Sequence, residues 1–289
     1  MKRRSFIASA ATASAGMMAP GQLWSRDDRK HPVQELKGNI NHSACYWCYD
    51  SIPLGKFLPE LKKLGVGAID LVGPADWPLL KKYGIHASMC WGAELNLTDG
   101  WCDPQFHPKL IASYSAMIPK VAEAGYTNLI CFSGSRRGMQ DEEGLQHAEK
   151  GLKQVLSLAE EHGVVLQMEL LNSKVDHKDY MCDHTPWGVA LCDRLGTENF
   201  KLLYDIYHMQ IMEGDVIRTL ETYSDYIGHY HTGGNPGRHE IDETQELYYP
   251  AIMKAIVKTG FKGYVAQEFI PSWEDKIAAL EQGVRICDV

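Results

Sequence analysis

The sequence predicts an α/β fold built as a single (β/α)8 TIM barrel. Short apolar runs that are typical of strands alternate with stretches whose apolar residues have helical spacing, and the alternation repeats eight times. A chain of 289 residues has room for a barrel, which takes about 250 residues. An open, doubly wound sheet is the alternative fold, but no G-x-G-x-x-G motif follows the first expected strand.

Each of the eight expected strands is a short apolar run, and each is followed by a segment of helical periodicity. In chain order these runs are NINHSACYW (39–47), VGAIDLVG (66–73), IHASMCWG (85–92), TNLICFSG (127–134), VVLQMELLN (164–172), FKLLYDIYH (200–208), YIGHYHTGG (226–234) and GYVAQEFIP (263–271).

The clearest helix is expected over residues 141–163, which carry acids in the first turn and end at Gly163. Four other expected helix-to-strand joints also have a glycine that can end a helix in the left-handed conformation: Gly65, Gly84, Gly125 and Gly260.

The N-terminus, MKRRSFIASAATASAGMMAP, combines a basic start containing Arg3 and Arg4 with Phe6 and a weakly apolar, alanine-rich stretch. This pattern resembles a twin-arginine export signal, so residues 1–26 are expected to be a signal and linker, and residues 27–289 the catalytic barrel domain. A periplasmic or exported location follows. A frayed basic N-terminus is the alternative. No later segment approaches the roughly 20 apolar residues of a permanent membrane span.

The net charge bears on the class of partner, and the cysteines bear on the class of scaffold. The net charge of −8 disfavours a protein that binds nucleic-acid phosphates and favours a small-molecule substrate. The eight cysteines are scattered, unlike those of a small disulfide-stapled scaffold. Cys45 and Cys48 form the one suggestive pair, and whether they bond to each other stays open.

Four consecutive strands each carry one metal-ligating side chain late in an apolar run: Glu169, Asp205, His231 and Glu268. Chemistry on a barrel of this kind sits at the carboxyl ends of the strands, and adjacent strands lie about 4.8 Å apart, so these side chains can converge. Three carboxylates and one imidazole suit Mg²⁺ or Mn²⁺, with Co²⁺ and Zn²⁺ as alternatives. Taken singly, each acid could instead cap a loop or pair with an arginine, and the histidine could be structural.

Three further residues are candidates for binding the substrate. His208 lies just past the sixth strand, where it can bond a substrate oxygen, or instead orient a ligand of the metal. Arg238 and His239 stand on the loop GGNPGRHE (233–240) after the seventh strand, and an arginine fork suits carboxylate or phosphate oxygens. Solvated loop residues are the alternative interpretation.

This set of groups suits proton transfer at a carbon next to a carbonyl. A divalent ion stabilises an enediolate while one glutamate removes the proton and another returns it. Glu169 and Glu268 are the expected catalytic pair, because a carboxylate that binds metal can still move protons with its free oxygen.

The motifs MELLN, YDIYHMQ, GHYHTGGNPGRHE with the following ELYYP, and GYVAQEF resemble the hydroxypyruvate isomerase branch of the xylose-isomerase-like barrel superfamily, which also contains ketose 3-epimerases. The resemblance implies that Glu169, Asp205, His231 and Glu268 are metal ligands. It also implies that Glu169 and Glu268 are the acid/base pair, and that His208 and Arg238 contact substrate.

The activity implied is interconversion of hydroxypyruvate and tartronate semialdehyde, an aldose-ketose type isomerisation. Hydroxypyruvate isomerases often carry glutamine where this chain has His231, and histidine there resembles the epimerase branch. A ketose 3-epimerase or an isomerase of another free sugar is therefore the alternative. An exported sugar-binding barrel without catalysis is the alternative of another class. Members of the superfamily often form homo-oligomers, but no interface can be read here.

Overall fold

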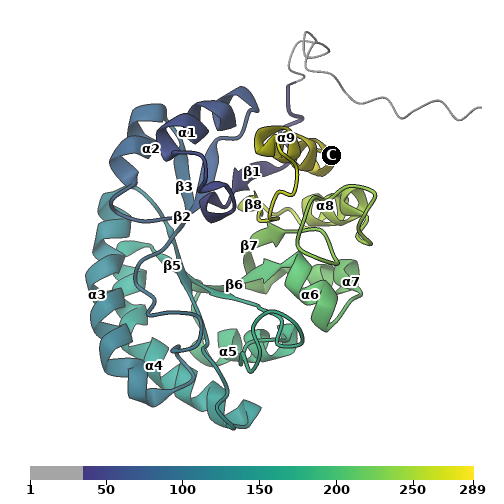
Figure 1. Ribbon diagram of the computed structural model, residues 1–289. Coiled ribbons are helices and arrows are strands. Elements are labelled where there is room, and N and C mark those ends of the chain that lie inside the picture. Colours follow the sequence, from purple (N-terminus) through teal and green to yellow (C-terminus); the bar gives the residue numbers. More distant parts are fainter. Residues whose placement is uncertain (1–34) are drawn as a thin grey trace, which may run out of the picture. The chain divides into compact units, whose positions relative to one another are not determined.

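Eight parallel strands in the computed structural model, which describes residues 35–289, form one sheet in the order β1-β8-β7-β6-β5-β4-β3-β2 (Figure 1). The two ends of this order, β1 and β2, meet through a parallel bridge between Cys45 and Asp70, so the barrel is nearly closed. The prediction of a single TIM barrel is confirmed. The strands are β1 (Asn41–Ala44), β2 (Ala68–Val72), β3 (His86–Cys90), β4 (Asn128–Cys131), β5 (Val165–Glu169), β6 (Phe200–Asp205), β7 (Ile227–Thr232) and β8 (Tyr264–Gln267).

The helices lie on the outer side of the strands, where Figure 1 shows them following one another around the barrel. They are α1 (Leu54–Lys63), α2 (Trp77–Tyr83), α3 (His107–Glu123), α4 (Asp141–His162), α5 (Thr185–Leu195), α6 (Ile206–Met212), α7 (Val216–Thr222), α8 (Tyr249–Lys258) and α9 (Lys276–Cys287). Short 3-10 helices are η2 (Tyr46–Tyr49), η3 (Pro104–Phe106) and η4 (Ser224–Tyr226).

Helix α4 forms where the acidic first turn predicted it. Asp141, Glu142 and Glu143 occupy that turn, where negative charge is favourable, and Gly163 ends the helix with a φ of 64°. The other four joint glycines also have positive φ. The sequence therefore placed this helix to within one residue.

The sixth strand is shorter than its apolar run. The run reaches His208, but the strand ends at Asp205 and α6 begins at Ile206. The Asp205 side chain caps this helix, because its Oδ1 accepts a hydrogen bond from the backbone N–H of His208 at 3.1 Å. The spacing of three residues between Asp205 and His208 is thus that of a helix cap and its third residue.

Of the expectations about membrane spans and the export signal, the structure bears only on the first. None of the helices in the described part is both long and apolar enough to cross a membrane. The expected export signal and linker, residues 1–26, lie outside the described residues, and the boundary at residue 27 stays a prediction.

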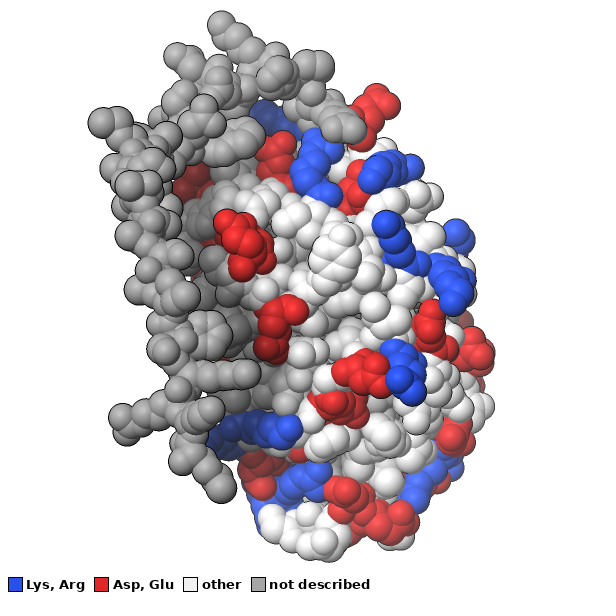
Figure 2. All heavy atoms as spheres, turned by 90° about the vertical axis from the view of Figure 1, so that its right-hand side faces the viewer, with Lys and Arg blue, Asp and Glu red and all other residues white. Residues whose placement is uncertain are grey.

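The surface in view in Figure 2, on the side of α6 to α9, carries acidic and basic side chains interspersed with one another. No continuous basic area lies over the described residues of this face. A mixed surface of this kind provides no electrostatic track for a phosphate backbone.

Candidate metal centre and substrate pocket

Glu169, Asp205, His231 and Glu268 come together as the sequence predicted. Each offers a ligand atom, these atoms all lie within 4.8 Å of one another, and all four residues are buried. Glu169 and Asp205 are the last residues of β5 and β6, His231 lies near the end of β7, and Glu268 follows β8 directly. The cluster therefore sits at the carboxyl end of the barrel, where sites on this fold lie.

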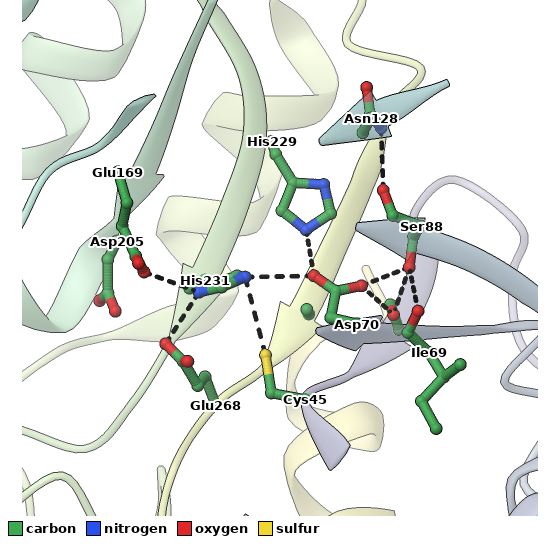
Figure 3. Close-up of polar contacts among 12 residues, drawn as sticks. Cys45, Ile69, Asp70, Ser88, Asn128, Glu169, Asp205, His229, His231 and Glu268 are labelled. Carbon is green, nitrogen blue, oxygen red and sulfur yellow. Dashed lines mark hydrogen bonds and ion pairs between the residues drawn. The ribbon is translucent and has the colours of Figure 1, made fainter. Parts of the chain in front are cut away.

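His231 stands at the centre of the cluster. Its Nδ1 is 2.8 Å from Glu268 Oε2 and 3.2 Å from Glu169 Oε1 (Figure 3). Two buried oxygens in this group, Glu169 Oε1 and Asp205 Oδ2, accept no hydrogen bond within the described residues: the first has the His231 ring at 3.2 Å, and the second lies 3.6 Å from both His208 Nε2 and Arg238 Nη2. Buried carboxylate oxygens without a hydrogen bond are costly, and a shared divalent cation would satisfy both. The donor set fits such an ion, although it does not choose among Mg²⁺, Mn²⁺, Co²⁺ and Zn²⁺.

The three carboxyl groups have unequal proton affinities. Burial raises the pKa of Glu169, and burial raises the pKa of Asp205 to about 8. Burial would also raise the pKa of Glu268, but the nearby charges of His231 and Arg238 outweigh it and hold that pKa well below its usual range. A divalent cation bound to the cluster would favour the charged form of all three carboxyl groups.

Arg238 lies beside the cluster, as expected for a substrate-binding residue. Its Nη2 is 2.7 Å from Glu268 Oε2 and 3.6 Å from Asp205 Oδ2. The guanidinium lies over the ring of Trp47, 5.2 Å from its centroid. Trp47 in turn donates from Nε1 to Glu268 Oε1 at 2.8 Å. Glu268 Oε1 is thus held by the indole, while Glu268 Oε2 meets the arginine and the histidine.

A pocket of about 420 Å³ opens onto Glu169, Glu268 and Arg238. Its remaining wall is mostly apolar and aromatic, and includes Leu71, Trp91, Leu97, Phe132 and Leu171; the polar members of this wall are His177, Glu94 and Asn96. His177 was missed by the sequence analysis. It belongs to the long polar connection between β5 and α5, and the length of that connection was the signal that could have drawn attention to it.

His208 and His239 do not line this pocket. His208 is fully buried, accepts from Asn172 Nδ2 at 2.5 Å through Nδ1, and places Nε2 3.6 Å from Asp205 Oδ2. That position matches the alternative interpretation, in which His208 orients a ligand. His239 is exposed and donates from Nδ1 to the Ile270 carbonyl at 2.9 Å. A direct substrate contact by either residue stays a prediction.

A second buried polar network, which the sequence analysis missed, lies behind His231. Asp70 Oδ2 accepts from Nε2 of His229 at 2.6 Å and from Nε2 of His231 at 3.1 Å (Figure 3). Its Oδ1 accepts from the hydroxyls of Ser43, at 2.6 Å, and Ser88. The signals for this network were the acid inside the apolar strand AIDLV and the second histidine two residues before His231, on the same face of β7.

The cysteines are all in the described part of the chain, and all eight are buried free thiols. Cys45 and Cys48 do not bond to each other. Cys45 places its Sγ 3.6 Å from Nε2 of His231, so this thiol packs against the ring behind the cluster.

The chain matches one known protein family over most of its length. Residues 78–287 match the family described as xylose isomerase-like TIM barrel, which is more than half of the chain.

Relatives with curated names share shorter stretches. The 2-oxo-tetronate isomerase of Cupriavidus necator is 36% identical over 109 residues, which are 38% of this chain and 41% of that protein. The hydroxypyruvate isomerase of Escherichia coli is 35% identical over 122 residues, 41% of this chain and 45% of that protein. The chain thus matches less than half the length of each of these relatives.

Solved structures share the fold over most of the chain. Among them is the D-psicose 3-epimerase of Clostridium cellulolyticum H10 with D-tagatose, with a TM-score of 0.68 and 17% sequence identity, covering 86% of this chain and 97% of that one.

Proposed function

Because the chain belongs to the xylose isomerase-like TIM barrel family, we propose that it is a metal-dependent isomerase acting on a small keto acid or sugar through an enediolate. The observation that carries this proposal is the pair of buried carboxylates, Glu169 and Glu268, held on either side of His231 Nδ1 at the edge of a pocket. A divalent ion held by Glu169, Asp205, His231 and Glu268 would polarise neighbouring substrate oxygens.

The roles of the chain's own residues follow from their contacts. One of the two glutamates takes the proton from the hydroxyl-bearing carbon, and the C–H electrons become the double bond of the enediolate. The proton returns to the former carbonyl carbon, and the hydroxyl proton moves between the two oxygens, so atoms and charge balance. Arg238, next to Glu268, is placed to bind the substrate's anionic or hydroxyl oxygens.

Hydroxypyruvate, converted to tartronate semialdehyde, is the substrate we propose first. It is supported by the likeness to hydroxypyruvate isomerase and to 2-oxo-tetronate isomerase, whose names both describe isomerisation of short oxo acids. Export to the periplasm is part of the proposal that rests on the sequence of residues 1–26 alone.

The pocket favours a second candidate, the epimerisation or isomerisation of a free ketose. A volume of about 420 Å³ lies within the range of sites for drug-sized ligands and exceeds the needs of a three-carbon acid. Its aromatic wall, with Trp47, Trp91 and Phe132, can pack against the apolar face of a sugar. A sugar-binding barrel without catalysis would use the same wall, so binding must be tested apart from turnover.

The test follows deuterium entry at carbon by NMR. Metal-replete protein is incubated in D₂O with hydroxypyruvate, with a 2-oxo-tetronate and with a panel of free ketoses. We expect deuterium in an isomer or epimer of one of these compounds, and we expect Glu268→Gln to lose at least 100-fold in rate, the lower range for a lost acid/base group. The matched control Glu274→Gln changes an exposed glutamate and should keep full activity.

Two results would count against the enzyme. No exchange with any compound, despite bound metal, would overturn the isomerase proposal. Saturable binding of a ketose without exchange would support the non-catalytic sugar-binding barrel.

A further inference from the structure

Asp70 is a fully buried carboxylate, and both of its oxygens accept hydrogen bonds. It lies on β2 and meets four donors: two serine hydroxyls at Oδ1, and Nε2 of both His229 and His231 at Oδ2. An ionised carboxylate is an acceptor only, so each of the two histidines must present an N–H to it. For His231 this fixes one proton on Nε2. The proton that a divalent cation would displace is then the one on Nδ1, the nitrogen that faces Glu268 Oε2 at 2.8 Å and Glu169 Oε1 at 3.2 Å.

The backbone around Asp70 is bent in a way that aims this side chain inward. The pairing of β2 with β3 shifts register on both sides of Asp70, which marks an irregularity of the β-bulge type. The next residue, Leu71, has a φ of 58°, a left-handed conformation that is unfavourable for a residue with a side chain. Bulges re-aim side chains and concentrate beside active sites. The backbone is therefore in an unfavourable conformation next to Asp70, at the point where this side chain turns into the barrel interior.

Asp70 reaches across the barrel rather than to a neighbouring strand. Across the bridge that nearly closes the barrel, β1 and β8 lie between β2 and β7, yet the Asp70 carboxylate meets His229 and His231 on β7 (Figure 3). The imidazole ring of His231 is thus held at both edges, by Asp70 at Nε2 and by the cluster at Nδ1.

We propose that Asp70 is a positioning residue: by accepting the Nε2–H of His231 it fixes the tautomer and direction of that ring, so that Nδ1 serves as a metal ligand. The inference rests on the metal centre of the proposed function. A histidine that binds metal through one nitrogen commonly donates its other N–H to a carboxylate, and losing that partner weakens metal affinity 10- to 100-fold.

The alternative in which Asp70 itself binds metal fits the contacts less well. Cys45, Asp70 and His231 also form a compact group of ligating residues. However, both Asp70 oxygens already accept hydrogen bonds, and His231 Nε2, the nitrogen nearest Cys45 Sγ, donates its N–H to Asp70 and so has no lone pair left for an ion there.

The first test measures Mn²⁺ affinity by electron paramagnetic resonance. Asp70→Asn keeps the shape of the side chain but replaces one acceptor oxygen by an NH₂ group, and we expect its dissociation constant for Mn²⁺ to rise 10- to 100-fold. The matched control is Asp183→Asn, which changes another buried aspartate, one that bonds to Arg136 and Ser173 instead. Its Mn²⁺ affinity should equal that of the wild type.

A second measurement needs no variant and therefore holds even if Asp70→Asn fails to fold. In the wild-type protein loaded with Mg²⁺, long-range ¹⁵N–¹H spectra of the histidine rings should show His231 protonated at Nε2 and unprotonated at Nδ1. A ring protonated at Nδ1, or an Asp70→Asn variant that folds and binds Mn²⁺ like the wild type, would overturn the inference.

The outcomes separate this inference from the proposed function. Mn²⁺ bound by the wild type and weakened in Asp70→Asn, without deuterium exchange on any substrate, would uphold the positioning role and reject the isomerase. Exchange with an unchanged Mn²⁺ affinity in Asp70→Asn would do the reverse. A wild type that binds no Mn²⁺ would overturn both.

Discussion

At the scale of single residues, Asp205 shows how one side chain can cap a helix and also face a candidate metal site. Its Oδ1 caps α6 through the N–H of His208, and its Oδ2 faces Arg238 and the cluster without a hydrogen bond. The two interpretations that the sequence left open, a cap and a metal ligand, are therefore compatible. A carboxylate has lone pairs enough for both, and the cap holds it in place for the second.

His42 provides a prediction about pH at this scale. The imidazole lies buried in β1, and burial lowers its pKa from 6.5 to about 4, although Asp288, 3.9 Å away, acts in the other direction. Between pH 6.5 and 4, His42 is therefore protonated in the unfolded chain but largely neutral in the folded protein. Stability is therefore complete above pH 6.5 and falls as the pH drops towards 4, by about 3 kcal/mol in total.

The check is the free energy of unfolding of metal-free protein measured by urea between pH 4 and 7. His42→Asn removes the titrating group, and the difference between wild type and variant should change across this interval. A difference that stays constant with pH would show that His42 titrates normally in the folded protein.

At the scale of secondary-structure elements, α4 is held close to its neighbours by glycines on its inner face. A Cβ at Gly144 would lie 2.4 Å from Met181 Cε, and one at Gly151 would lie 2.7 Å from Nε2 of His107. His107 cannot simply move, because the same Nε2 bonds to the Trp101 carbonyl at 2.9 Å. The helix thus accepts two residues of poor helix propensity in return for close packing.

We expect Gly151→Ala to destabilise the protein. Alanine gains about 1 kcal/mol of helix propensity, but overpacking of a buried contact costs about 1–3 kcal/mol and breaks the His107 hydrogen bond as well. The melting temperature should fall, while Gln154→Ala on the exposed face of α4 should leave it nearly unchanged. A rise in melting temperature for Gly151→Ala would contradict the expected overpacking against His107.

At the scale of the whole molecule, the barrel gathers charges from strands that lie far apart in the sequence. The four cluster residues come from β5, β6, β7 and the loop after β8, and three of them are carboxylates in a buried space. Arg238 offsets part of this charge but leaves Asp205 Oδ2 and Glu169 Oε1 without hydrogen bonds. The folded barrel therefore has a site that a cation can stabilise.

Metal removal should accordingly lower the stability of the whole domain. A ligand that binds only the folded state adds about 2.7 kcal/mol at a free concentration about 100 times its dissociation constant. We expect EDTA to lower the melting temperature and at least one of Mg²⁺, Mn²⁺, Co²⁺ and Zn²⁺ to restore it, with the restoring ion identifying the metal. Glu169→Gln should lose most of the response and Glu274→Gln should keep it. A melting temperature indifferent to EDTA and to all four ions would refute the metal centre.

Much of the fold and of the site could be predicted from the sequence because the signals for them are local. Strands, helices and joint glycines follow from the periodicity of neighbouring residues, and the carboxyl ends of parallel strands meet at one face whatever the side chains are. Glu169, Asp205, His231 and Glu268 needed only this rule to be grouped together. The sequence by itself therefore determined the barrel and the composition of its polar end.

The tertiary structure alone decided the contacts that join distant strands. Asp70 meets His231 across the barrel at a separation of 161 residues, and no local pattern encodes the bulge that turns it inward. His208 is turned into the core and His239 towards solvent by packing that residue spacing does not fix. Side-chain direction depends on where whole strands and loops settle, because packing is a property of the assembled barrel rather than of any one segment.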